Sequence, residues 1–453
     1  ALTCCLSRFR DPVVDLIKVQ YPVNKFSYGY QMLKKTARSG TFTDNMKLPV
    51  HRWFRYSAGF SAEWVVAEIE KFQEETGNKA VILEPFTGSG TTNIAADSLG
   101  VSSYGFEGHP FVSRIAKAKQ HWNASTIELI KAGKEVIELA ASLKTTPEIS
   151  RFSEDNLLGK CYSFEAFKKL EQLKTSYETL AEVNSPIWEL VRLNITSILR
   201  ACSHVGTAQW QYVLPNKSKS KVLDPFEAFN AKLEIMISDM EYAVSSGWKH
   251  CSHITQHDVR QSFEVPQKCN LIITSPPYPN NYDYADATRL EMMFWGEING
   301  WGDLKNIVRP SLMRSCSQHS ASDKIVLEEV LNDPLLFPIK DEISVVTKQL
   351  DEIRHTKGGK KTYHTMVAAY FLDLAKIWSN LRGNMSDDSK ICFVIGDSAP
   401  YGIHVPAEKW LGELALAAGF KSFSFEKLRD RNIKWKNRTH TVPLHEGRLW
   451  IKG

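Results

Sequence analysis

The sequence predicts an α/β fold in which a parallel sheet is interrupted by a large helical insertion. Apolar runs at Val81–Leu83 and Ser103–Glu107 alternate with helical patterns, and a glycine-rich turn joins the first run to its helix. Strands that alternate with amphipathic helices form βαβ units of a parallel sheet. Residues 124–250 then show only helical periodicity. That stretch is too long for a connection inside a compact sheet, so we expect an inserted helical domain.

The first part of the sheet has clear start and stop signals. Ser61 is a candidate N-cap for a helix that begins at Ala62. The helix Thr91–Leu99 ends at Gly100, because a glycine just past a helix takes the left-handed conformation without strain. A further helix is expected from Pro110 to Gln120.

Strand character returns at Cys269–Thr274 and at Ile391–Ile395, on either side of a polar stretch at about 297–362. Helices are expected at Tyr363–Leu381, whose stripe of Met366, Tyr370, Leu374 and Trp378 predicts a core face, and at Ala407–Ala418. Ser422–Phe425 and Gly447–Ile451 look like closing antiparallel strands. The predicted segments are an N-terminal extension (1–50), the sheet domain in three parts (51–123, 251–296 and 363–453), the helical insertion (124–250) and a second insertion (297–362).

Composition narrows the class of protein without naming a function. The 453 residues are 43% hydrophobic with a net charge of +5, and no run of 18 apolar residues suggests a membrane span. The first residues lack the basic leader of a signal peptide, so we expect a cytoplasmic protein with no membrane contact. Eight cysteines without C-x-x-C spacing indicate reduced thiols and no zinc site or other metal.

The segment Leu83–Thr92 has the sequence expected of a ligand-binding loop between a strand and a helix. Gly88 and Gly90 allow the backbone to approach a ligand, and the helix that follows presents free N–H groups. Glu107 ends the next strand, 23 residues after Glu84, where nucleotide-binding folds hold ribose hydroxyls. The alternative is an ordinary turn with a surface glutamate.

The segment Thr274–Tyr278, Thr-Ser-Pro-Pro-Tyr, ends a buried strand. Consecutive prolines exclude regular pairing, so the strand stops and its last carbonyl groups lie at the carboxyl edge of the sheet, where ligands bind. A plain rigid turn is the alternative interpretation. The loop at 83–92 makes a site the better one.

Together the two segments resemble the cofactor loop and the catalytic loop of amino-group DNA methyltransferases, which make N4-methylcytosine or N6-methyladenine. The resemblance implies a Rossmann-like seven-stranded methyltransferase sheet, S-adenosylmethionine as methyl donor and flipping of the target base. Ser275 and the Pro276 carbonyl would accept hydrogens of the base amine, and Tyr278 would stack on the extruded base. The predicted catalytic residues are Ser275, Pro276, Pro277 and Tyr278.

The resemblance also implies a set of cofactor-binding residues. Glu107 would bind the ribose, Asp258 the adenine amine, and Phe60-Ser61 would close over the methionine moiety. Gly396-Asp397-Ser398 resembles a later loop of the family. The full predicted set is Phe60, Ser61, Glu84, Pro85, Phe86, Gly88, Ser89, Gly90, Thr91, Thr92, Glu107, Asp258 and Thr274.

The resemblance favours double-stranded DNA as substrate and a role in restriction–modification or phage defence, with a cognate restriction endonuclease as a partner. Serine before Pro-Pro-Tyr favours cytosine-N4 methylation, while adenine-N6 methylation and RNA methylation stay open. The insertion 124–250 is the candidate target-recognition domain. Two basic runs are candidate phosphate contacts or, equally, solvated surface: Lys217, Lys219 and Lys221, and Arg429, Arg431, Lys434, Lys436 and Arg438.

Overall fold

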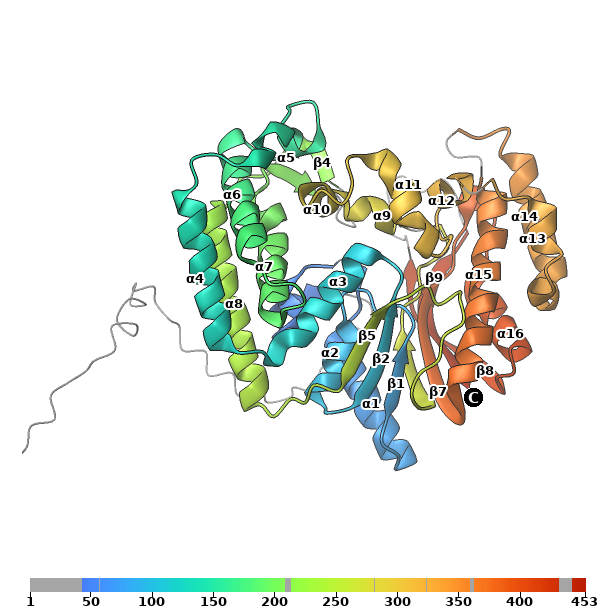
Figure 1. Ribbon diagram of the computed structural model, residues 1–453. Coiled ribbons are helices and arrows are strands. Elements are labelled where there is room, and N and C mark those ends of the chain that lie inside the picture. The colour runs from blue at the N-terminus through green and yellow to red at the C-terminus, as the bar shows by residue number, and fades with distance from the viewer. Residues whose placement is uncertain are drawn as a thin grey trace, which may run out of the picture. The chain divides into compact units, whose positions relative to one another are not determined.

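The computed structural model describes residues 43–56, 58–207, 213–280, 282–322, 324–358, 362–431 and 442–453, which belong to one compact unit, Arg38–Gly453. Within these residues a seven-stranded sheet has the order β5-β2-β1-β6-β7-β9-β8 (Figure 1). The first five strands run parallel, and β9 is antiparallel to both of its neighbours. The strands are β1 Val81–Glu84, β2 Ser102–Glu107, β5 Ser252–Gln256, β6 Cys269–Thr274, β7 Met385–Gly396, β8 Ser422–Arg431 and β9 Leu444–Lys452.

This sheet confirms the predicted α/β fold, and the early helices begin where the sequence signals place them. The Ser61 hydroxyl accepts a hydrogen bond from the backbone N–H of Trp64 (3.3 Å) and so caps α1 (Ala62–Thr76). Helix α2 (Thr91–Ser98) is followed by Gly100 at φ 62°. Helix α3 (Pro110–Lys119) has proline in its first turn.

Strand β5 is missing from the sequence prediction. Its residues, Ser-His-Ile-Thr-Gln, include one aliphatic side chain, and only Ser252 and Ile254 are buried. It lies at the end of the sheet and pairs with β2 alone, so a continuous apolar run is not required. The strand matters because Asp258 follows it directly.

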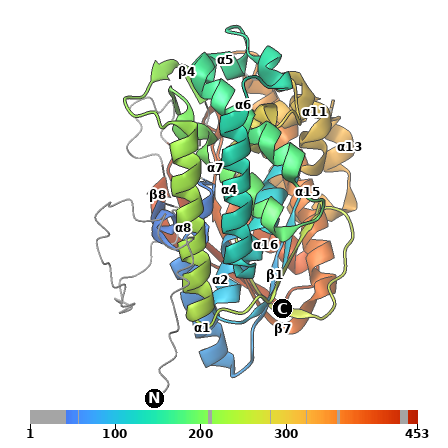
Figure 2. The same cartoon turned by 60° about the vertical axis from the view of Figure 1, so that its left-hand side comes forward.

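Residues 124–250 fold mainly as helices, and α4 and α8 lie side by side (Figure 2). The purely helical pattern of the sequence misses one feature, because Lys217 belongs to a short antiparallel strand. Its sequence, Val-Leu-Pro-Asn-Lys-Ser, contains a proline and only two aliphatic residues, so it gives little signal for a strand. The elements are α4 Thr126–Ser142, α5 Leu157–Cys161, α6 Phe164–Leu180, α7 Pro186–Cys202, α8 Pro225–Ser245 and the hairpin β3 Val205–Thr207 with β4 Val213–Ser218.

The segment between β6 and β7 is also largely helical. Helices α9 to α12 lie near the upper end of the sheet in Figure 1, and α13 and α14 lie beyond α15. The helices are α9 Tyr284–Ala287, α10 Arg289–Phe294, α11 Leu304–Ile307, α12 Ser317–Ser322, α13 Leu327–Leu331, α14 Lys340–Ile353 and α15 Tyr363–Asn384, and α16 Ala407–Ala417 follows β7.

Helix α15 buries the predicted stripe against the sheet. Met366, Tyr370, Leu374 and Trp378 are fully buried, as the periodicity indicates, and the Trp378 ring stacks on Phe393 of β7 (4.5 Å between ring centres). Aromatic stacking of this kind adds to the free energy of area burial. The helix thereby fixes the position of β7, which neighbours β6, the strand that precedes the predicted catalytic loop.

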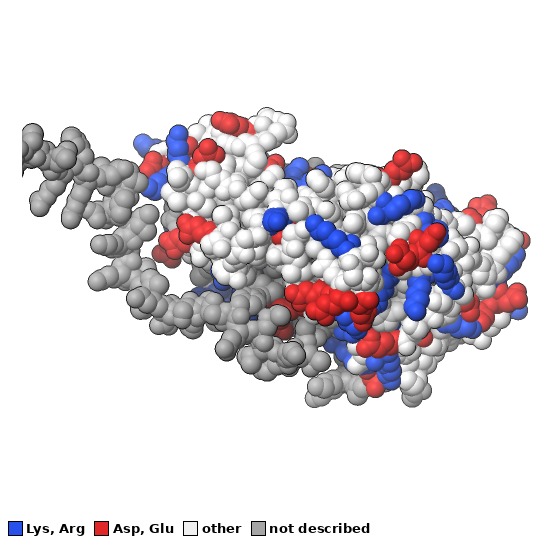
Figure 3. Space-filling model, turned by 90° about the horizontal axis from the view of Figure 1, so that it is seen from below, with Lys and Arg blue, Asp and Glu red and all other residues white. Residues whose placement is uncertain are grey.

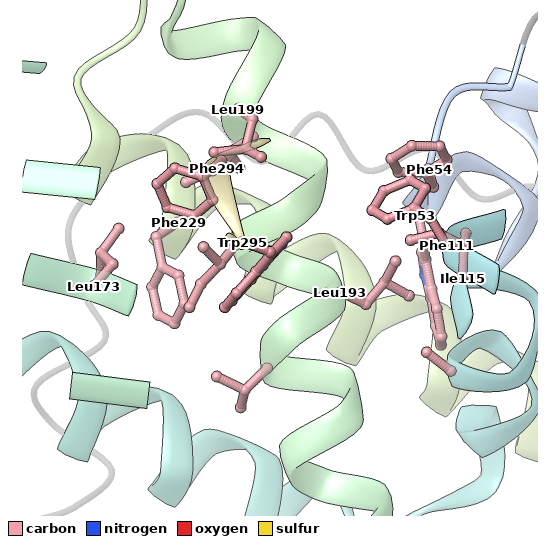
Figure 4. Close-up of a cluster of buried hydrophobic side chains, with 14 of the residues drawn as sticks. Trp53, Phe54, Phe111, Ile115, Leu173, Leu193, Leu199, Phe229, Phe294 and Trp295 are labelled. Atoms are coloured by element: carbon pink, nitrogen blue, oxygen red, sulfur yellow. The ribbon is translucent and has the colours of Figure 1, made fainter. Parts of the chain in front are cut away.

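A second hydrophobic core joins the helical insertion to the N-terminal part of the described chain. Figure 4 shows α7 with Leu193 facing Trp53 and Phe54, while Leu173 and Phe229 lie in the neighbouring part of the same cluster. The segment preceding α1 is also held by Asp239 of α8. That carboxylate accepts hydrogen bonds from the backbone of Val50 and from the side chains of Arg52 and Trp53.

The surface gives little functional direction by itself. On the described part of the face in Figure 3, acidic and basic side chains are interspersed. Among the described helices, each is too short or too polar to cross a bilayer. Cys161, Cys202, Cys269, Cys316 and Cys392 are free and buried, Cys251 is free and partly buried, and Cys4 and Cys5 lie outside the described residues.

Candidate cofactor and catalytic site

The two predicted loops meet where the strand order of the sheet reverses. From β1 the chain moves to β2 and β5 on one side, and it then returns to β6 on the other side of β1. Loops at the carboxyl ends of the strands that flank such a point form a ligand-binding crevice. A cavity that opens to solvent lies here, as expected for a ligand site at the ends of such strands.

Residues of both loops line this cavity. The predicted site residues at its wall are Phe60, Pro85, Phe86, Gly88, Ser89, Thr91, Glu107, Asp258, Ser275 and Pro277. Cavity residues that sequence reasoning missed are Tyr56, Ala58, Gly59, Thr87, Gly108, His109, His257, Val259, Tyr284, Ser311, Leu312 and Met313. Seven predicted residues do not line the cavity: Ser61, Glu84, Gly90, Thr92, Thr274, Pro276 and Tyr278.

Glu84 connects the two loops from behind. It is 1% exposed, and its carboxylate accepts hydrogen bonds from the Phe86 backbone N–H (2.9 Å) and from the hydroxyls of Thr92 (2.8 Å) and Thr274. Burial raises the pKa of Glu84 to about 7, against the opposing effect of these hydrogen bonds. Because Thr274 precedes Ser275, the carboxylate fixes the start of the catalytic loop relative to the cofactor loop.

Glu107 stands at the cavity wall at the end of β2. Its Oε2 accepts a hydrogen bond from the Gly88 N–H and its Oε1 one from the His109 N–H, both 2.8 Å. Burial raises the pKa of Glu107 to about 7. A carboxylate oxygen accepts more than one hydrogen bond, so both oxygens retain lone pairs for ligand hydroxyls.

The backbone around Glu107 requires two glycines. Gly88 has φ 54°, and a Cβ atom there would lie 3.1 Å from the Tyr56 ring. At Gly108 a Cβ would lie 2.2 Å from the Ser311 carbonyl oxygen. Gly108 thus lets the segment around Ser311 close over the cavity, and this glycine next to Glu107 is the one signal in the sequence for that contact. The donors, the carboxylate and the close backbone fit a nucleoside cofactor with a vicinal diol.

Asp258 follows β5 and is held in one orientation. Its carboxylate accepts hydrogen bonds from Arg260 Nε (2.9 Å) and Nη2 (2.7 Å). Arg260 also donates to the Pro310 carbonyl (2.6 Å) and reaches the buried Asp373 (3.3 Å). The prediction for Asp258 is therefore compatible with its place at the cavity wall.

The catalytic loop is fixed by hydrogen bonds to neighbouring elements. The Ser275 hydroxyl donates to the Val394 carbonyl (3.1 Å), and its oxygen also makes a side-chain hydrogen bond with Tyr278. One lone pair of the serine oxygen remains to accept a further hydrogen bond. The Tyr370 hydroxyl donates to the Pro277 carbonyl (2.8 Å). Burial raises the pKa of Tyr278, and the Arg431 guanidinium lies 5.1 Å from the centre of its ring.

The predicted basic residues do not form one group. Arg431 donates to the Asp397 carbonyl (2.6 Å), Arg429 pairs with Glu446 (2.8 Å), and Lys219 donates to the Ala201 carbonyl (3.2 Å). Exposed side chains are present at Lys217 and Lys221, while Lys434, Lys436 and Arg438 lie outside the described residues. Arg431 thus supports Tyr278 and the loop at Asp397.

The loop after β7, Gly396-Asp397-Ser398, is also tied into the fold. The buried Asp397 carboxylate accepts hydrogen bonds from His404 Nε2 (2.8 Å) and from the His445 backbone N–H (2.7 Å). These contacts raise the pKa of His404, chiefly through its hydrogen bond to Asp397. The loop is a support beside the catalytic strand, outside the cavity wall.

Comparison with known proteins gives two similar relatives over most of the chain. The Type II methyltransferase M.BsoBI of Geobacillus stearothermophilus is 25% identical over 86% of this chain and 82% of its own length. The Type II methyltransferase M.AvaI of a Nostoc species is 23% identical over 84% of this chain and 81% of its own length. No protein-family model and no solved structure matches. The chain is therefore related to the Type II methyltransferases, which confirms the predicted resemblance to the amino-group methyltransferase family.

Proposed function

We propose that the chain is a site-specific DNA methyltransferase that transfers a methyl group from S-adenosylmethionine to the exocyclic N4 amine of cytosine. The observation that supports this most is the shared cavity, whose wall includes both Glu107 and Ser275. The Glu107 carboxylate suits a ribose diol, and the Ser275 hydroxyl suits an amine. Both lie where the strand order of the sheet reverses, as in methyltransferases. The similarity to Type II methyltransferases makes DNA the substrate of choice.

Glu107 and the cofactor loop have the task of orienting the donor. Glu107 would accept hydrogen bonds from the two ribose hydroxyls, and Asp258 would accept one from the adenine amine. The backbone at Gly88–Thr91 would face the methionine moiety. When bound, S-adenosylmethionine supplies an activated methyl group on its sulfonium sulfur. The protein's contribution is alignment of this group and exclusion of water.

Ser275 and the prolines have the task of orienting the base amine. The lone pair of this amine is delocalised into the ring, so hydrogen-bond acceptors at its hydrogens make the nitrogen a better nucleophile. Ser275 retains one accepting lone pair, because its own proton is donated to Val394 and its other hydrogen bond is with Tyr278. The loop 274–278 contains no cysteine, so we propose direct transfer without a covalent enzyme–base intermediate.

The target base reaches such a cavity only after extrusion from the duplex, so base flipping belongs to the proposal. The helical region 124–250, the largest part that the sheet does not need, is the proposed target-recognition domain. The proposed setting is a cytoplasmic restriction–modification or phage-defence system with an endonuclease acting on the same site.

Mapping of modified bases tests the proposal directly. The chain is expressed in a host without other DNA methylation, and its genome is sequenced by a method that distinguishes N4-methylcytosine from N6-methyladenine. N4-methylcytosine at one repeated motif is expected. N6-methyladenine instead would change the proposed target base to adenine, while methyl transfer to an exocyclic amine would still hold. Labelled methyl groups in transfer or ribosomal RNA but absent from duplex DNA would refute the DNA assignment.

Ser275→Ala tests the role of the catalytic loop. Loss of one positioned polar group is expected to lower single-turnover methyl transfer by about 10²-fold. Affinity for S-adenosylmethionine should stay near that of the wild type. The matched control is Ser379→Ala, the same chemical change at an exposed position of α15. A fully active Ser275→Ala enzyme would contradict the assignment.

A further inference from the structure

Trp301 is exposed to an unusual degree for an indole. It is 46% exposed and lies just before the short helix α11, where Ile307 is also 46% exposed. Leu304 and Val308 on the other side of this helix are fully buried. The segment 301–307 thus presents two apolar side chains to solvent, with the exposed Lys305 between them in the sequence. Apolar wedges beside a basic residue are a feature of proteins that insert side chains between DNA bases.

Trp301 rests on a rigid support. The Arg309 guanidinium, 2% exposed as a residue, lies 4.6 Å from the centre of the indole. Arg309 Nη2 pairs with Asp283 Oδ2 at 2.8 Å, and Asp283 in turn accepts hydrogen bonds from the first N–H groups of α9. A buried guanidinium that is held by a carboxylate has little freedom to move. The indole is therefore preorganised.

The same support forms part of the cavity wall. Tyr284 follows Asp283 directly and lines the cavity, and Ser311, two residues after Arg309, lines it as well. Both ends of the Asp283–Arg309 ion pair are thus next to wall residues. Helices α9 and α11, which contain or adjoin these residues, lie together near the upper end of the sheet in Figure 1. Trp301 itself does not line the cavity, but it packs on Arg309, which is close in the chain to the wall residue Ser311.

We propose that Trp301 contacts duplex DNA beside the target base and stacks in the space that the extruded base leaves. This inference rests on the proposed DNA methyltransferase function. Extrusion breaks stacking on both neighbours of the target, and an aromatic face replaces part of that stacking. Arg309 positions the indole, and Ile307 adds apolar contact on the same surface. Trp301 is a DNA-contacting residue here and has no role at the methyl donor.

The test compares Trp301→Ala and Trp301→Phe on a duplex that contains the mapped recognition site. Trp301→Ala is expected to lower kcat/KM for this duplex by about tenfold or more, on the scale of one lost base–aromatic stack. Trp301→Phe should retain most of the activity. In duplexes with 2-aminopurine at the target position, the fluorescence rise that reports extrusion should be smaller for Trp301→Ala. Affinity for S-adenosylmethionine and the melting temperature should not change.

A mispaired target base separates this role from a general effect on the fold. Such a base costs less to extrude, so the loss caused by Trp301→Ala should narrow on the mispaired duplex. The control is Phe337→Ala, since Phe337 is 57% exposed and has the Lys340 ammonium 5.1 Å from its ring, but belongs to the segment beside α14. Wild-type kinetics for Trp301→Ala, or an equal loss on both duplexes, would overturn the inference. A wild-type enzyme that methylates no DNA would refute the proposed function itself.

Discussion

Binding of S-adenosylmethionine is expected to strengthen as pH rises through about 7, because of Glu107. In the free protein burial raises the pKa of this carboxyl to about 7, so half of it is protonated at neutral pH. Ribose hydroxyls donate to the carboxylate form, so binding lowers the pKa and releases a proton. Affinity should therefore increase about tenfold between pH 6 and pH 8 and level off above that.

Isothermal titration calorimetry at pH 6, 7 and 8 in buffers of different ionisation enthalpy measures both the affinity and the proton release. Glu107→Gln should bind about tenfold or more weakly at pH 8, as expected for loss of a charged acceptor, and show little pH dependence. Glu84 also has a pKa near 7, but it lies behind the wall. If the affinity of Glu107→Gln for the cofactor depended on pH as that of the wild type does, the reasoning would be refuted. Another titrating group would then cause the pH dependence.

Two further predictions concern close packing and a buried carboxylate. Gly108→Ala should weaken cofactor binding in calorimetry at least tenfold, because its Cβ would lie 2.2 Å from the Ser311 oxygen. Gly302→Ala, with no atom within 4 Å, is its control and should bind normally. Asp239→Ala should lower the free energy of unfolding by about 3 kcal/mol in urea, since several donors lose a buried acceptor. Glu241→Ala, a change at an exposed position of the same helix, should lower the free energy of unfolding only slightly. Equal decreases for the two variants would contradict the role of Asp239 in holding the segment before α1.

The parts of the fold that the sequence predicts are those with local causes. Glycine at 88 and prolines at 276 and 277 restrict the backbone wherever they occur, so the loops after β1 and β6 are visible without a structure. The buried stripe of α15 is equally local, because periodicity alone determines which face is apolar.

The rest depends on contacts between distant residues. Strand β5 has few apolar residues because it pairs on one side only, so its residues resemble a loop. The wall at Ser311–Met313 comes from a segment about 200 residues after Glu107, and no local pattern marks it. The run of basic residues predicted a phosphate contact for Arg431. In the structure this side chain contacts Tyr278 and Asp397 instead. The partners that the fold brings near a guanidinium, rather than the composition of its segment, determine what it binds.

The shared core of the helical region limits how this protein can be redesigned. Leu193 of α7 packs in one cluster with Trp53, Phe54 and Phe111, which precede or belong to the first part of the sheet domain. A chimera that takes residues 124–250 from a relative would place foreign side chains against these rings and leave cavities or clashes. Exchange of the helical region with that of a relative therefore requires the residues at 50–54 and on α3 to be exchanged with it, as one matched set.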